Sequence, residues 1–325
     1  MAGLEKKPFL HHSGMGKPLE EFAKSMTAGP KAILEEYILI QKNDPVLPTP
    51  TCQANTRLNR WGDIKCFEDT RVKLSPPRDY IHANYVDGYE QHRRFICTQG
   101  PLKNTINDFW RMVWQEKCCV ILALTKVGGA KCELYFPDKP RTAMQYGDIK
   151  VQNTGFREVE NAYVEIAHQV SDGSGEKRTV SQLIYFGWPD KGSPLDSGLF
   201  LEFMERYMRL QERNTAALAV AGTWDVRSQP NGPPIVVHCS AGVGRTGTLC
   251  AMDIMIHRLR ATRNAPNGPL ITVGQLVMSM RRQRHKAVQR PEQYLFCYMA
   301  IIQFALQEGL ISPDKVDVSS FLKRQ

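Results

Sequence analysis

The chain has 325 residues, of which 42% are hydrophobic and 23% charged, a composition typical of soluble globular proteins. Its 42 basic and 33 acidic residues leave a net charge of +9, which suits acidic partners such as phosphorylated peptides, anionic membrane surfaces or nucleic acid. The nine cysteines have neither zinc-type spacing nor a signal peptide before them, and no apolar run is long enough to cross a membrane. These features exclude a disulfide scaffold and structural zinc, and they predict a cytoplasmic protein without a membrane span.

Two helices are predicted near the N-terminus. Apolar residues recur at helical spacing in 19–26 and again in 34–38, after Gly29-Pro30. The proline-rich stretch 45–50 interrupts regular structure. We expect both helices to pack on the rest of the domain.

The middle of the chain is predicted to alternate strands with helices. Strands are expected at 79–85, 120–124, 147–153, 162–170 and 183–186, and helices at 109–114 and 199–207. The segment 214–234 is predicted to be a loose connection, longer than most. The chain is long enough for one large α/β domain or two small ones.

The most informative stretch is 235–248, which reads as a buried strand, a loop of small residues and a helix. The loop begins at Cys239 and ends at Arg245. Backbone N–H groups gather at such a helix N-terminus and favour an anion there, including a cysteine thiolate. Arg245 adds a planar guanidinium that can hold two oxygens of a phosphoryl group. Cys239 and Arg245 are therefore predicted to be a nucleophile and an oxyanion clamp, with His238 orienting the loop.

A further helix is predicted around 273–280, followed by the basic run 281–286. After it come Gln289 and Gln293, whose amides can orient a water without deprotonating it.

The string His-Cys-Ser-Ala-Gly-Val-Gly-Arg-Thr-Gly at 238–247 resembles the signature of the protein tyrosine phosphatases. Other motifs are similar to that family in the same order: Asn-Arg-Trp at 59–61, Gln-Gly-Pro at 99–101, Lys-Cys at 131–132 and Trp-Pro-Asp at 188–190. The resemblance covers roughly residues 30–308. It implies a single cysteine-phosphatase domain with a highly twisted mixed β-sheet flanked by α-helices.

The resemblance also implies roles for individual residues. The catalytic set would be Cys239, Arg245, Asp190, Gln289 and Thr246. In it, Asp190 protonates the leaving tyrosine oxygen from a loop that glycines leave free to move. The substrate-binding set would be Trp61, Asp63, Ser240, Ala241, Gly242, Val243, Gly244, Gln293, Lys131, Arg281 and Arg284. Within this set Trp61 stacks on the substrate ring, Asp63 accepts hydrogen bonds from the peptide backbone, and Arg281 and Arg284 lie on the pocket side.

The chain departs from the family pattern at four places. Trp61 replaces the usual tyrosine, and the loop 126–130 lacks the glutamate that pairs with the signature arginine in many members. Lys191 stands where an aromatic residue or histidine is common, and Lys286 where glycine is common.

The implied function is hydrolysis of phosphotyrosine in proteins through a phosphocysteine intermediate, with no metal or organic cofactor. Three alternatives stay open: a phosphotyrosine-binding pseudophosphatase, a phosphatase of broader specificity, and a nucleic-acid-binding protein. We expect a monomer that acts on phosphotyrosine-containing proteins and not on nucleic acid. Its predicted parts are an N-terminal extension with the first helix (1–29), the phosphatase domain (30–308) and a C-terminal tail (309–325).

Overall fold

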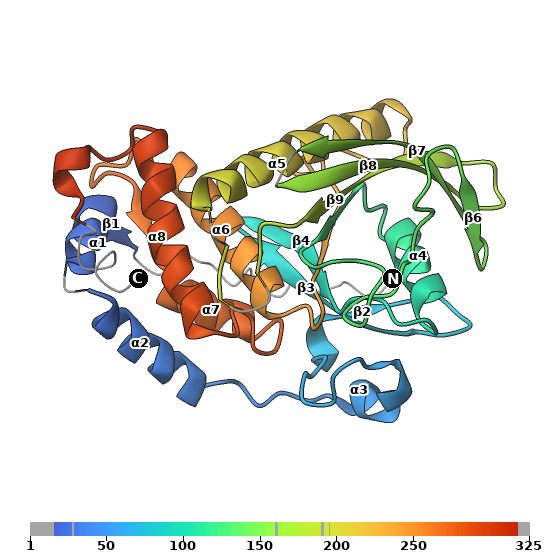
Figure 1. Cartoon of the computed structure of the whole chain (residues 1–325), viewed down its shortest axis with the longest axis horizontal. Helices are drawn as coiled ribbons and strands as arrows, with labels where there is room; N and C mark the ends of the chain where they lie inside the picture. The colour runs from blue at the N-terminus through green and yellow to red at the C-terminus, as the bar shows by residue number, and fades with distance from the viewer. Residues whose placement is uncertain (1–15, 28, 160–161, 190–191, 195, 318–325) are drawn as a thin grey trace.

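The computed structural model describes residues 16–27, 29–159, 162–189, 192–194 and 196–317. Its centre is a twisted nine-stranded mixed sheet (Figure 1). From edge to edge the strands are β2 (Arg71–Lys73), β3 (Tyr80–Gly88), β4 (Gln91–Thr98), β10 (Ile235–His238), β5 (Val120–Ala123), β9 (Lys177–Tyr185), β8 (Tyr163–Ser171), β7 (Ile149–Val159) and β6 (Ala143–Tyr146). The four middle strands, β4, β10, β5 and β9, run parallel, and the outer pairs are antiparallel.

Helices cover both faces of this sheet. The described helices are α1 (Leu19–Met26), α2 (Pro30–Lys42), α3 (Pro50–Ala54), α4 (Ile106–Gln115), α5 (Ser197–Val220), α6 (Gly244–Ala261), α7 (Gly274–Arg281) and α8 (Pro291–Gln307), with 3₁₀ turns η1 (Thr56–Leu58), η2 (Glu68–Thr70) and η3 (Pro313–Lys315). One short pair, β1 (Lys17–Pro18) with β11 (Leu270–Ile271), joins the N-terminal segment to the region after α6.

The strand β10 is buried on both faces because helices lie above and below it. Ile235 and Val237 belong to the core shared with α5, α6 and α8, whereas Val236 belongs to the core shared with α4. This is the period-2 alternation of a strand, with apolar residues required on both sides. It places His238, and Cys239 after it, at the carboxyl edge of the parallel strands, where α/β proteins commonly bind ligands.

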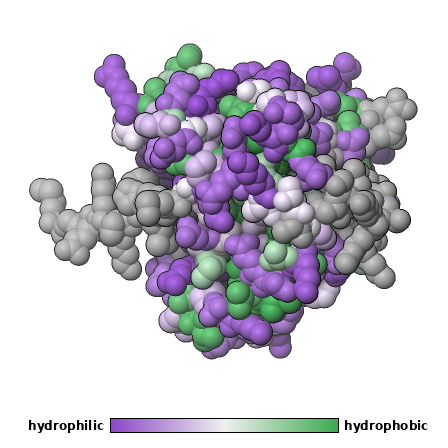
Figure 2. Space-filling view, turned by 90° about the vertical axis from the view of Figure 1, so that its left-hand side faces the viewer, coloured by the Kyte–Doolittle hydropathy of each residue, from purple (hydrophilic) through white to green (hydrophobic). Residues whose placement is uncertain are grey.

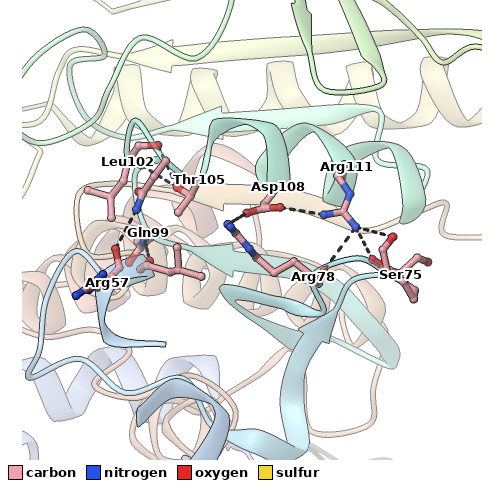
Figure 3. Close-up of polar contacts among 11 residues, drawn as sticks. Arg57, Ser75, Arg78, Gln99, Leu102, Thr105, Asp108 and Arg111 are labelled. Carbon is pink, nitrogen blue, oxygen red and sulfur yellow. Dashed lines mark hydrogen bonds and ion pairs between the residues drawn. The ribbon is translucent and has the colours of Figure 1, made fainter. Parts of the chain in front are cut away.

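An ion-pair cluster anchors the start of α4. Asp108 is almost fully buried between Arg78 and Arg111, which approach its two oxygens at 2.7 and 2.9 Å (Figure 3). Arg111 also donates to the carbonyl of Ser75. Two guanidinium groups around one carboxylate satisfy the buried charge, so this helix is held against the β2–β3 connection.

Most predicted elements are confirmed, but two boundaries are wrong. The strand predicted at 183–186 begins earlier, since β9 starts at Lys177. The predicted loose connection begins too early, because α5 continues to Val220. Asn214 explains the longer helix: its buried amide donates to the carbonyl of Cys119, just before β5, and to the hydroxyl of Ser181 on β9. α1 packs on the main core through four buried side chains, Leu19, Phe22, Ala23 and Met26, as expected of the N-terminal helices.

Figure 2 shows the face that lies on the left of Figure 1, where hydrophilic residues cover most of the described surface and hydrophobic ones form small separate patches. Within the described residues, no helix combines the length and apolar character needed to cross a bilayer.

Buried histidines predict how stability depends on pH. His168 is fully buried, and burial lowers its pKa to about 4. Because the unfolded chain binds this proton with a pKa of about 6.5, stability is fully present above that pH and falls as the pH drops toward 4. We expect His168 to account for a loss of about 2 kcal/mol in unfolding free energy between pH 7 and pH 5. Urea denaturation followed by circular dichroism at both pH values should show a smaller drop for His168→Gln. Equal decreases in unfolding free energy for wild type and His168→Gln would show that His168 does not cause the loss.

Candidate active site

The segment that follows β10 forms a tight loop around a sulfur atom. Cys239 leaves the strand, and α6 begins five residues later at Gly244. The N–H of Gly242 donates to Cys239 Sγ at 3.2 Å, so the loop curls back over the sulfur. Cys239 is only 6% exposed, yet it lines a cavity that opens to the surface.

Backbone hydrogen bonds from three separate segments hold this loop from outside. The carbonyls of His238, Ser240 and Val243 accept from the N–H groups of Leu124 (2.8 Å), Gly100 (2.9 Å) and Val288 (3.1 Å), respectively. These donors come from the end of β5, the turn after β4 and the segment before α8. The loop carbonyls therefore point away from the sulfur.

Arg284 satisfies the two loop carbonyls between them. It is 1% exposed, and its guanidinium donates to Gly242 O and Ala241 O, each at 2.9 Å. A third nitrogen donates to Asn84 Oδ1 at 2.8 Å and lies 3.2 Å from His82 Nδ1. With these carbonyls directed outward, the loop N–H groups are left to face the cavity and an oxyanion bound there.

Two glycines are required by this geometry. Gly242 has φ +69°, and a Cβ there would lie 2.0 Å from the carbonyl oxygen of Thr98. A Cβ on Gly247 would lie 2.4 Å from the backbone nitrogen of Val288. Both contacts are with backbone, which cannot move aside, so larger residues would displace the loop.

A directional chain of hydrogen bonds ends at the nucleophile. Buried His168 bonds Gln182 Oε1 (2.8 Å), and the Gln182 amide donates to the Tyr135 hydroxyl (2.8 Å). The Tyr135 hydroxyl then donates to His238 Nε2 (2.7 Å), leaving Nδ1–H to face the carbonyl of Cys239 at 3.2 Å. Burial lowers the pKa of His238 to about 4, so this imidazole is neutral and orients the loop, as predicted from its position.

Arg245 projects into the cavity from the first turn of α6. It donates to Leu124 O at 2.9 Å and to Pro189 O at 2.8 Å. The loop 126–130, which lacks a carboxylate, is thus not needed to orient this side chain. These two main-chain carbonyls help to orient Arg245.

The predicted general acid Asp190, and Lys191 beside it, lie outside the described residues. Their neighbours are described: Trp188 is buried against Phe200 and Phe296, and its indole N–H donates to Gly192 O at 3.1 Å. Gly192 itself lines the cavity. The placement and role of Asp190 stay a prediction.

Arg60 holds the segment that carries Trp61 and Asp63. Its guanidinium donates to three backbone carbonyls at 2.8 to 2.9 Å, those of Gly100, Pro101 and Ala130. The backbone N–H of Arg60 donates to Gln99 Oε1, and Gln99 Nε2 donates to the carbonyl of Leu58. These contacts connect the first loop to the turn after β4, where Figure 3 also shows Gln99. Sequence analysis missed Arg60 and Gln99 as positioning residues, although both lie within quoted motifs.

The resulting cavity measures about 410 Å³ and brings together most of the predicted site. Its described lining consists of Trp61, Asp63, Ile64, Thr125, Lys131, Gly192, Cys239, Ser240, Ala241, Gly244, Arg245, Gln289, Arg290 and Gln293. Three of these side chains are cationic, namely Lys131, Arg245 and Arg290, and Asp63 is the one carboxylate among the described lining residues. The described lining therefore favours an anion. The adjacent thiol of Cys132 is buried, which raises its pKa to about 12 and keeps it protonated.

Two predicted positions differ from expectation, and Gly242 and Val243 of the loop are not part of the described cavity lining. Arg281 and Arg284 do not lie on the cavity side: both are buried behind the loop, where Arg281 donates to backbone carbonyls of Ala287 and Val288 and pairs with Asp44 at 2.8 Å. Their burial needs this dense set of partners, which the sequence pattern alone could not reveal. Thr246 is also fully buried, and its hydroxyl has no hydrogen-bond partner among the described residues.

Comparison with known proteins agrees with this geometry. A model of the protein-tyrosine phosphatase family matches residues 55–303. Tyrosine-protein phosphatase non-receptor type 9 of Rattus norvegicus is 39% identical over 295 residues, which cover 86% of this chain and 47% of that protein. Tyrosine phosphatase H2 of Microplitis demolitor bracovirus is 35% identical over 274 residues, which cover 83% of this chain and 81% of that protein. The chain thus spans about half the length of the mammalian relatives it matches.

Removing Arg284 should damage anion binding without touching the cavity surface. In Arg284→Met the carbonyls of Ala241 and Gly242 lose their hydrogen-bond partner. The loop then relaxes, and its N–H groups no longer point into the cavity. We expect affinity for tungstate, measured by isothermal titration calorimetry, to fall about 10- to 100-fold, as misplaced binding groups typically do.

Arg282→Met is the matched control, since Arg282 is exposed on the same segment and carries the same charge. Equal affinities in the two variants would show that Arg284 does not shape the loop. Circular dichroism would verify that both proteins are folded.

Proposed function

Because the chain belongs to the protein-tyrosine phosphatase family, we propose that it hydrolyses phosphotyrosine in proteins through a phosphocysteine intermediate. The observation that carries the proposal is the loop itself, in which Cys239 Sγ accepts a main-chain N–H and Arg245 lines the same cavity. A sulfur nucleophile within a ring of donors is what attack on a phosphate dianion requires.

In the first proposed step, Cys239 attacks phosphorus as the bond to the tyrosine oxygen breaks. Arg245 and the loop N–H groups stabilise the three equatorial oxygens, where negative charge is spread in the transition state. Asp190 transfers its proton to the departing oxygen, so the leaving group is neutral tyrosine and not a phenolate. The products are free tyrosine side chain and S-phosphocysteine.

In the second step, water hydrolyses the phosphocysteine. Asp190, now a carboxylate, accepts a proton from the water, and the Gln289 and Gln293 amides orient it. The phosphorus–sulfur bond breaks and phosphate leaves. Thr246 is proposed to donate a hydrogen bond to the returning thiolate, a role supported by its buried hydroxyl, which has no partner in the described part of the chain.

The shape of the cavity supports an aryl phosphate as substrate. Trp61 is 45% exposed at the cavity wall, where its ring offers a face for stacking. We also propose that the protein acts as a monomer in the cytoplasm, where a reducing medium suits its nine free cysteines. The domain limits 30–308 remain a proposal alongside the family match at 55–303.

The test is hydrolysis of a phosphotyrosyl peptide by wild type, Cys239→Ser and Asp190→Ala. We expect Cys239→Ser to bind peptide without turnover and Asp190→Ala to lose about 10²- to 10⁴-fold in kcat, the usual contribution of a general acid. Cys132→Ser, which changes a neighbouring cysteine in the same way, should retain activity.

Each alternative has its own outcome in this assay. Tight binding by wild type without turnover would make the protein a pseudophosphatase. Equal rates on phosphoseryl and phosphotyrosyl peptides would indicate broad specificity. Full activity of Cys239→Ser would refute the proposed nucleophile.

A further inference from the structure

An ion pair crosses the rim of the catalytic cavity. Lys286 Nζ lies 3.2 Å from Asp63 Oδ2 and 3.4 Å from the Asp63 carbonyl oxygen. Asp63 belongs to the first loop, and Lys286 to the segment between α7 and Gln289. Beside this pair, the N–H of Lys65 donates to His285 Nδ1 at 3.0 Å, so the two walls of the cavity are joined twice.

Lys286 occupies a backbone conformation that does not suit a lysine. Its φ is +56°, in the left-handed region that glycine adopts without steric cost. The side chain placed there reaches directly to the only carboxylate in the described cavity lining. A residue that keeps an unfavourable backbone conformation while its side chain brings a charge to a binding site has the pattern expected of a functional residue.

The pair is exposed enough to exchange partners. The Lys286 side chain is 33% exposed and the Asp63 side chain 67% exposed. Ion pairs in such surroundings are weak, because water competes for both charges. A carboxylate arriving from outside can therefore displace Asp63 from Lys286.

We propose that Lys286 selects substrates that carry aspartate or glutamate next to phosphotyrosine. This inference rests on the proposed function, because it assumes that a phosphotyrosine ring fills the cavity. The residues flanking that tyrosine must then pass over the rim where Asp63 and Lys286 lie. Without Lys286, the Asp63 carboxylate would repel an acidic flank; with it, Lys286 pairs with the substrate carboxylate and Asp63 is released to accept peptide N–H groups.

The experiment compares phosphotyrosyl peptides that differ only in one flanking residue, which is Glu, Gln or Lys. Rates are measured as kcat/KM and divided by the same enzyme's rate on p-nitrophenyl phosphate, which has no flanking residue. We expect wild type to favour the Glu peptide over the Gln peptide about two- to fivefold, through KM and not kcat, as suits one exposed ion pair. Raising the salt concentration should reduce this preference.

Two variants at Lys286 and one control decide the proposal. Lys286→Gly removes the charge and suits the positive φ, so it should fold normally and lose the preference for Glu. Lys286→Glu should invert it, favouring the Lys peptide. Lys65→Glu makes the same charge change on the facing loop, where Lys65 Nζ donates to Gly62 O and lies outside the described cavity lining.

The inference is overturned if Lys286→Gly keeps the preference for Glu. It is equally overturned if Lys65→Glu changes the preference as much as Lys286→Glu, because the effect would then be long-range charge and not contact. Failure of the proposed function looks different: wild type itself would hydrolyse neither the peptides nor p-nitrophenyl phosphate.

Discussion

The site depends on one constraint, which is that every carbonyl of the loop after β10 must find a partner on its outer side. Backbone N–H groups from three distant segments satisfy His238, Ser240 and Val243, and the Arg284 side chain satisfies Ala241 and Gly242. Each peptide unit that turns its oxygen outward turns its N–H inward. The electrostatics of the cavity therefore follow from hydrogen bonds made behind it.

Arg284 and Arg245 have different roles in this arrangement. Arg284 is buried outside the described cavity lining, and its planar guanidinium donates to two loop carbonyls at once. A buried guanidinium is costly unless every donor is satisfied, and Asn84 and His82 complete its partners. Arg245 instead lines the cavity, where its guanidinium can contact an anion. A lysine could replace neither, because a single ammonium cannot reproduce the fork geometry.

Local sequence patterns were sufficient for most strands, the longer helices and the nucleophile loop, because strand and helix periodicity and the small-residue run are properties of short segments. They did not predict the strands β2, β4 and β6. They failed where side chains act across the fold. Arg281 and Arg284 were expected on the pocket side, and only tertiary packing shows them buried. Arg60 and Gln99 are likewise separated in sequence from the carbonyls they bind. The end of α5 was missed because Asn214, a poor helix former, has partners just before β5 and on β9 that compensate for this.

The missing carboxylate in the loop 126–130 can now be understood as a change in electrostatics. A glutamate beside Arg245 would orient the guanidinium but would also offset its charge and compete with an incoming dianion. The carbonyls of Leu124 and Pro189 orient Arg245 through their dipoles and add no negative charge of their own. Because Pro189 directly precedes Asp190 in the chain, the same hydrogen bond ties the anion clamp to the segment that carries the proposed acid. The orientation of Arg245 and the position of that segment are then coupled, so a change in either affects both steps of the proposed reaction.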